Sequence, residues 1–80
     1  MGVYEAVKAR LLNLCEERKL TINKLATSAG IPRSSLKNIL YGKSHNPGIV
    51  TLKILCDGLE ISLKDFFDSK EFWALEQELK

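Results

Sequence analysis

The chain has 80 residues, enough for one small domain, and a domain of this size has little room for a deep substrate cleft. Its 45% hydrophobic and 28% charged residues are a balance typical of a folded globular protein. The net charge is only +2, but no acidic residue occurs between Arg18 and Cys56. A surface built from this stretch does not repel phosphate groups, which favours a nucleic-acid-binding module over an enzyme.

Metal, membrane and secretion signals are missing from the sequence. Cys15 and Cys56 are the only cysteines and His45 is the only histidine, so the spacing of zinc ligands is absent and we expect no metal site and no cofactor. Both cysteines fall on apolar helix faces, which favours buried free thiols over a disulfide bridge. No apolar run reaches the length of a membrane span, and the first ten residues include the charged Glu5, Lys8 and Arg10 and not the apolar core of a signal peptide. We therefore expect a cytoplasmic protein without membrane contact.

Three helices are predicted in the first half of the chain. An apolar stripe from Val3 to Cys15 predicts the first helix, which ends near residue 19. Thr21 is a suitable N-cap for a short second helix. Gly30 then allows the chain to leave that helix with a positive φ, and Pro32 fixes the φ angle needed to start a third helix, Pro32 to Leu40.

Turn-forming residues at 41–48 predict a loop, after which three further helices follow. The fourth runs from Ile49 to Leu59, and the fifth is capped by Ser62 and ends at Phe67. The last is an amphipathic helix within residues 68–80, capped by Asp68 or Ser69, with its apolar side chains at Phe72, Trp73, Leu75 and Leu79. No strand pattern occurs, so the sequence predicts an all-α fold divided into residues 1–67 and 68–80.

The second and third helices, joined by a glycine turn, have the spacing of a helix-turn-helix. The string Thr21-x3-Leu25-Ala26-x3-Gly30-Ile31-Pro32-x3-Leu36-x2-Ile39-x2-Gly42-Lys43 resembles the phage Cro and C1 repressor type of helix-turn-helix, also called the XRE family. The resemblance covers about residues 5 to 67. It implies a lambda-repressor-like domain of five helices, here followed by a short extra C-terminal helix, that binds double-stranded DNA and regulates transcription as a repressor.

The resemblance also implies which side chains read bases in the major groove. They occupy the first turn of the third helix and the turn after it: Arg33, Ser34, Lys37 and Asn38. Their chemistry agrees, because Arg33 can donate two bonds to guanine O6 and N7, and Asn38 can pair with adenine N6 and N7. The alternative is that these side chains form an ordinary solvated helix face.

In the family, the DNA backbone is contacted by the start of the second helix and the loop after the third. The corresponding residues are Thr21, Asn23, Lys24, Tyr41, Lys43 and His45. Ile22 stands where the family often has Gln, and Pro32 replaces a Ser or Thr that often caps the third helix. Asn23, Lys24 or backbone N–H groups are therefore expected to bind phosphate there. For His45 the alternative is a solvent-exposed bystander.

The resemblance to family repressors implies a two-fold dimer that binds two DNA half-sites one helical turn apart. Our hypothesis is a homodimer formed through residues 68–80, although the same segment can instead fold back on the domain. We expect no catalytic residues and no small-molecule substrate, because the chain lacks a GxSxG, an HExxH or a phosphate-binding loop. The alternative is that a domain of the same fold binds a protein and not DNA, as an antitoxin or a partner of another regulator does.

Overall fold

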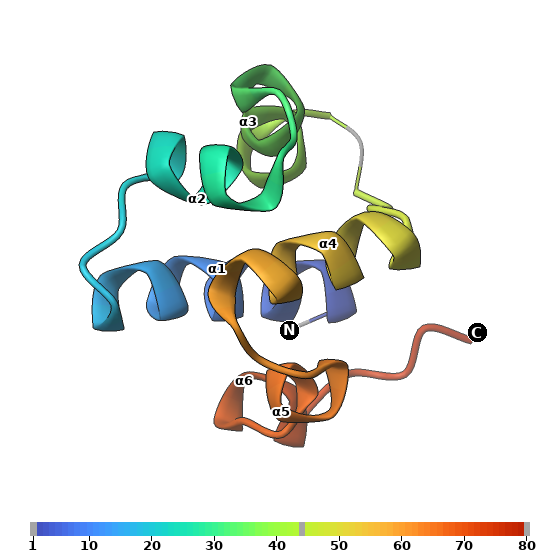
Figure 1. Ribbon diagram of the computed structural model, residues 1–80. Coiled ribbons are helices and arrows are strands. Elements are labelled where there is room, and N and C mark those ends of the chain that lie inside the picture. The colour runs from blue at the N-terminus through green and yellow to red at the C-terminus, as the bar shows by residue number, and fades with distance from the viewer. Residues whose placement is uncertain (1, 44, 80) are drawn as a thin grey trace.

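The computed structural model describes residues 2–43 and 45–79, and within them every regular element is a helix. The helices are α1 (Val3–Glu17), α2 (Ile22–Ala29), α3 (Arg33–Tyr41), α4 (Ile49–Leu59), α5 (Leu63–Phe67) and α6 (Lys70–Trp73). α1 and α4 lie in the middle of the molecule, with α2 and α3 at one end and α5 and α6 at the other (Figure 1). The predicted all-α fold of five helices and a short sixth is confirmed.

One hydrophobic core joins the first five helices. Phe66 of α5 is its largest fully buried side chain, and each of the other four contributes leucines, among them Leu11, Leu25, Leu36 and Leu55. Burying one such side chain contributes about 1.5–3 kcal/mol to folding. Since α2 packs chiefly on α4 and α3, the two helices of the helix-turn-helix are attached to the domain through α2.

Three helices end in the same way, with one residue in the left-handed backbone region and an apolar residue after it. The pairs are Lys19–Leu20 after α1, Gly30–Ile31 after α2 and Glu60–Ile61 after α4. In each pair the apolar residue donates its N–H to a carbonyl five residues back and packs against the core. Gly30, with φ of 71°, was predicted at such a position and is the one residue of the three without a Cβ to strain.

Side-chain caps start α2 and α5 as predicted. The hydroxyl of Thr21 accepts a 3.0 Å bond from the N–H of Lys24, and that of Ser62 accepts a 3.0 Å bond from the N–H of Asp65. α3 begins differently: Pro32 occupies the N-cap position, with φ −60° and ψ 142°, and no side chain caps the helix. α3 therefore begins at Arg33 and not at Pro32, and it ends one residue later than predicted.

The last helix is shorter than the sequence pattern predicts. α6 covers only Lys70–Trp73, and the chain continues through residues 74–79 without helix. Phe72 packs with two aromatic rings of α5, its ring centroid lying 5.8 Å from that of Phe66 and 5.0 Å from that of Phe67. The apolar residues beyond it find no such surface, because Leu79 is 80% exposed. A helix this short is not stable without packing, so it ends where the contacts end.

Both cysteines are buried and free, which confirms the sequence prediction. Burial raises the pKa of Cys15 and of Cys56 above the ordinary thiol value, so neither is a reactive thiolate at neutral pH. None of the helices in the described ranges is long and apolar enough to cross a membrane.

Gly58 provides a test of the packing of α2 on α4. It lies inside α4, and a Cβ there would lie 3.0 Å from the backbone N of Ala29 in α2. We expect Gly58→Ala to lower the free energy of unfolding by about 1–2 kcal/mol, because the displaced backbone outweighs the gain of about 1 kcal/mol in helix propensity. Urea unfolding measures the change.

Gly48→Ala is the matched control, because a Cβ at Gly48 would meet only the hydroxyl of Thr51, at 3.9 Å. Gly48 is the N-cap of α4, where Ala is less favourable than Gly, so the substitution should lower the free energy of unfolding by no more than about 0.5 kcal/mol. A Gly58→Ala protein as stable as this control would contradict the close approach of the two helices.

Candidate nucleic-acid interface

The two helices of the helix-turn-helix meet through buried side chains. Leu25 and Ala26 of α2 and Leu36 and Leu40 of α3 are all at most 2% exposed. Since residues four apart share one face of a helix, burial of Leu36 and Leu40 directs the opposite face of α3 into solvent. α3 lies at the end of the molecule farthest from α5 and α6, where nothing in the described chain covers it (Figure 1).

All four predicted base-reading residues lie on α3 and are exposed. Arg33 and Ser34 occupy its first turn, and Lys37 and Asn38 lie one turn later. Within residues 2–43 and 45–79, the side chains of these four make no hydrogen bond or ion pair with the protein. Their donors are therefore available to an external ligand.

Asn38 is the member of this group with the most restricted surroundings. Its side chain lies along α3 toward Gly42, so close that a Cβ at Gly42 would overlap both the amide oxygen and the backbone carbonyl of Asn38. Gly42 also donates its N–H to that carbonyl, at 2.9 Å. Gly42 therefore leaves room for the side chain of Asn38, which a Cβ at that position would displace.

The predicted backbone-contacting residues form two groups, one on each side of α3 along the chain. Thr21, Asn23 and Lys24 surround the start of α2 and are exposed. The hydroxyl of Thr21 already accepts a hydrogen bond from the N–H of Lys24, so its observed role is to cap α2. The side chains of Asn23 and Lys24 extend from the same turn and are available for phosphate.

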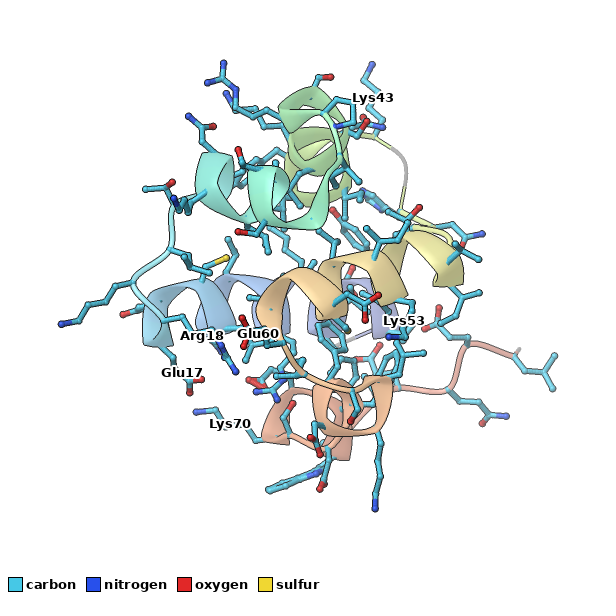
Figure 2. The ribbon with its side chains drawn as sticks, viewed as in Figure 1. Glu17, Arg18, Lys43, Lys53, Glu60 and Lys70 are labelled. Carbon is cyan, nitrogen blue, oxygen red and sulfur yellow. The ribbon has the colours of Figure 1, made fainter. Side chains whose placement is uncertain are left out.

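The second group lies at the end of α3 and in the loop after it. Tyr41 is 59% exposed and the ammonium of Lys8 lies 5.1 Å from its ring centroid. Lys43 is exposed and projects beyond the end of α3 (Figure 2). His45 stacks on Tyr4, with ring centroids 4.3 Å apart and an interplanar angle of 9°.

The surroundings of His45 are more acidic than its place in the sequence suggests. It lines a hollow of about 360 Å³ together with Glu5 and the tail residues Glu76 and Glu78. Carboxylates repel a phosphate group. The acidic residues that share its hollow therefore make a phosphate contact at His45 less favourable.

The structural roles of two side chains, one at the end of α3 and one at the opposite end of the molecule, were missed in the sequence. Tyr4 donates its hydroxyl to the carbonyl of Ile39, at 2.8 Å, and Arg10 donates to the carbonyls of Phe66 and Asp65, both at 2.9 Å. Arg10 thus binds the last carbonyls of α5, far from α3. Neither pairing has a local sequence signal, because each joins residues more than 30 positions apart.

The family of the chain follows from a comparison with known domains. Residues 10–71 match the Cro/C1-type helix-turn-helix DNA-binding domain. The chain belongs to this family. The match confirms the resemblance seen in the sequence and the function of the domain, which is DNA binding and not catalysis. The matched range ends at residue 71, within α6.

Two relatives of this Cro/C1-type domain come from Bacillus subtilis (strain 168). The HTH-type transcriptional repressor RghR is 40% identical over 57 residues, which are 71% of this chain and 42% of RghR. The HTH-type transcriptional regulator SlrR is 36% identical over 62 residues, which are 76% of this chain and 41% of SlrR. The chain thus spans less than half the length of these two proteins.

A solved structure has the same fold over nearly the whole chain. The crystal structure of the prophage Lp1 protein 11 superposes with a TM-score of 0.79 at 36% sequence identity. The superposition covers 94% of this chain and all of that one. The two proteins therefore share their arrangement of helices over almost the full length of this Cro/C1-type domain.

The capping role of Thr21 and its predicted phosphate contact can be separated by substitution. Asp caps a helix as well as Thr does and its charge is favourable at a helix N-terminus, so Thr21→Asp should leave the free energy of unfolding within about 0.5 kcal/mol of the original value. Its carboxylate should nevertheless lower DNA affinity about tenfold at low salt if phosphate lies beside it. Urea unfolding and fluorescence anisotropy with a labelled duplex measure the two effects.

Thr21→Ser is the control, since it keeps both the cap and the neutral hydroxyl, and it should bind DNA like the original protein. If Thr21→Asp binds DNA as tightly as Thr21→Ser, the start of α2 does not lie on the DNA backbone.

Proposed function

We propose that this Cro/C1-type domain binds a specific sequence of double-stranded DNA, with α3 in the major groove, and represses transcription from that site. The observation that carries the proposal is the exposed face of α3, whose four polar side chains have no partner among the described residues. The names of RghR and SlrR, a repressor and a regulator, support it. The activity belongs in the compartment that holds the DNA, which in a bacterium is the cytoplasm.

In this proposal Arg33 and Asn38 supply the sequence specificity. Arg33 donates two bonds to a guanine from the first turn of α3, and Asn38 pairs with an adenine one turn later. Ser34 and Lys37 lie between them on the same face and contact neighbouring base edges or phosphate. Pro32 leaves the first turn of α3 without a side-chain cap, so its N–H groups are available to a phosphate.

The remaining contacts are with the DNA backbone. We assign them to Thr21, Asn23 and Lys24 at the start of α2 and to Tyr41, Lys43 and His45 after α3. Such contacts fix the orientation of the domain on the duplex but carry no sequence information. His45 contributes least, because Glu5, Glu76 and Glu78 share its hollow.

We also propose that the protein acts as a homodimer that uses the tail, residues 68–80. Phe72 is packed on α5, so it belongs to the domain and not to the interface. Trp73 is 73% exposed, and Leu75 and Leu79 are exposed beyond it. Several large apolar side chains exposed along one short segment are typical of a segment that a partner covers, and a second copy of the chain gives the two-fold symmetry of palindromic DNA sites.

The assignment of base-reading and backbone-binding residues predicts two different effects of substitution, a loss of sequence preference and a loss of overall DNA affinity. Arg33→Ala and Asn38→Ala should each lower the preference for the best duplex over random DNA by about 1–3 kcal/mol. Lys43→Ala should weaken binding to both duplexes alike and reduce the salt dependence by about one phosphate contact. The best duplex comes from selection on a random pool, and anisotropy titrations at several salt concentrations give the affinities.

An equal loss of affinity on selected and random DNA for Arg33→Ala would assign Arg33 to a phosphate instead. No binding of any duplex at about 50 mM salt would contradict DNA binding by this chain, since a module with several phosphate contacts still binds there.

A protein partner in place of DNA is the second candidate, and one observation favours it. Ile49 and Val50, in the first turn of α4, are exposed beside an apolar hollow of about 310 Å³ that Val3 and Phe67 help to line. In this second candidate function, an antitoxin or a partner of another regulator would bind a second protein through such an exposed apolar surface. Failure to bind DNA together with a stable complex with a second protein would support this candidate.

The dimer is tested with Trp73→Ser and Leu79→Ser combined. We expect the original chain to sediment as a dimer at micromolar concentration and the double variant as a monomer, because the exposed apolar area of the tail is lost. Helix content should not change, since Phe72 is retained. A double variant that still sediments as a dimer would exclude the tail as the interface.

A further inference from the structure

We infer that Tyr4 is a positioning residue for sequence reading, because its hydroxyl holds the C-terminal end of α3 in the orientation that DNA requires. The inference rests on the proposed function and concerns a residue of α1 that lies outside the helix-turn-helix. It follows from how α3 ends, from what Tyr4 contacts there, and from where α3 is otherwise attached.

α3 ends without the motif that closes α1, α2 and α4. Gly42, the residue after it, has an extended backbone with φ of −83° and ψ of −177°, so no left-handed residue returns N–H groups to the last turn. Gly42 donates its own N–H to the carbonyl of Asn38. The carbonyls of Ile39 and Leu40 come next, and a helix leaves its last carbonyls without a partner inside the helix.

Tyr4 supplies the partner from a distance of 35 positions in the sequence. Its hydroxyl lies 2.8 Å from the carbonyl oxygen of Ile39 and 3.4 Å from that of Leu40, and it is partly buried. Its ring stacks on His45, at 4.3 Å between centroids, in the loop that follows α3. One side chain of α1 thus contacts both the last turn of α3 and the loop after it.

Lys8 lies one helical turn after Tyr4 on the same face of α1, and its ammonium lies 5.1 Å from the ring centroid of Tyr41. α1 therefore reaches the last residue of α3 as well as its carbonyls. Tyr41 and His45 are two of the residues that we assign to the DNA backbone, so this part of α1 lies directly behind the proposed DNA surface.

The position of Tyr4 matters because the C-terminal end of α3 is otherwise held by apolar packing. Leu36 and Leu40 are buried in the core, and their burial sets which face of α3 points inward. Apolar packing has little directional preference, whereas a hydrogen bond requires a particular distance and angle. The bond from Tyr4 therefore restricts the position of the last turn of α3 more narrowly than Leu40 alone does. Tyr4 gives α3 this second, directional attachment, next to Asn38.

Tyr4→Phe tests the inference, because it keeps the ring and its stack on His45 but removes the donor. We expect the preference for selected over random DNA to fall about threefold to tenfold, the effect of one lost hydrogen bond. The loss should be concentrated at the base pairs where Asn38→Ala also loses discrimination, and be smaller where Arg33→Ala does. Replacing Tyr4 by 4-aminophenylalanine, which restores a donor at the same place, should recover the preference.

Ser62→Ala is the matched control: it also removes one side-chain hydrogen bond, the cap of α5 at the opposite end of the molecule. It should lower stability comparably and leave the DNA preference unchanged. Equal losses of preference in Ser62→Ala and Tyr4→Phe would overturn the inference, because the effect would then be general destabilisation. An unchanged preference in Tyr4→Phe would overturn it as well.

Amide hydrogen exchange separates this result from a failure of the proposed function. In Tyr4→Phe without DNA, we expect the amides of Tyr41 and Gly42 to exchange about threefold to tenfold faster than in the original chain, with the amides of α5 unchanged. If the original chain shows no sequence preference, the proposed function fails, and exchange still decides whether Tyr4 holds α3. Unchanged exchange at both amides would overturn the inference whatever the DNA result.

Discussion

Burial of Leu36 and Leu40 is the constraint on which the DNA-binding surface depends. α3 has nine residues, too few to be a stable helix alone in water, so it exists because these two side chains and Leu25 of α2 share one core. The spacing of 3.6 residues per turn then leaves Arg33 and Lys37 on the opposite side. The same contacts that form α3 thus decide which of its residues a ligand can meet.

The ends of the helices show how the chain positions that core. After α1, α2 and α4, a left-handed residue reverses the chain and the following apolar side chain enters the core, so each turn is held by the interior. The end of α3 has no such local closure and instead uses Tyr4, a side chain from another helix. Among the described residues, it is therefore the one of these four helix ends at which a side chain from another helix binds the last carbonyls.

Features with a local cause could be predicted from the sequence, and features with a distant cause could not. Thr21 and Ser62 cap helices through residues three positions away, and Gly30 acts through its own backbone. The roles of Tyr4 and Arg10 depend on carbonyls 35 and 56 positions away, which no periodicity marks. The last helix was predicted too long for a related reason. Its apolar spacing continues beyond Phe72, but Phe72 is the last of these side chains that packs on the rings of α5.

The order of charged residues along the sequence also does not show which charges lie together on the surface. The stretch without acidic residues includes His45, but the fold returns the start of α1 and the tail to the same hollow, with Glu5, Glu76 and Glu78. Lys43, which projects past the end of α3, is not among the residues that line this hollow. A phosphate would therefore meet an exposed ammonium at Lys43 but carboxylates around His45. The sign of the local charge thus changes between Lys43 and His45, which the order of charges along the chain does not reveal.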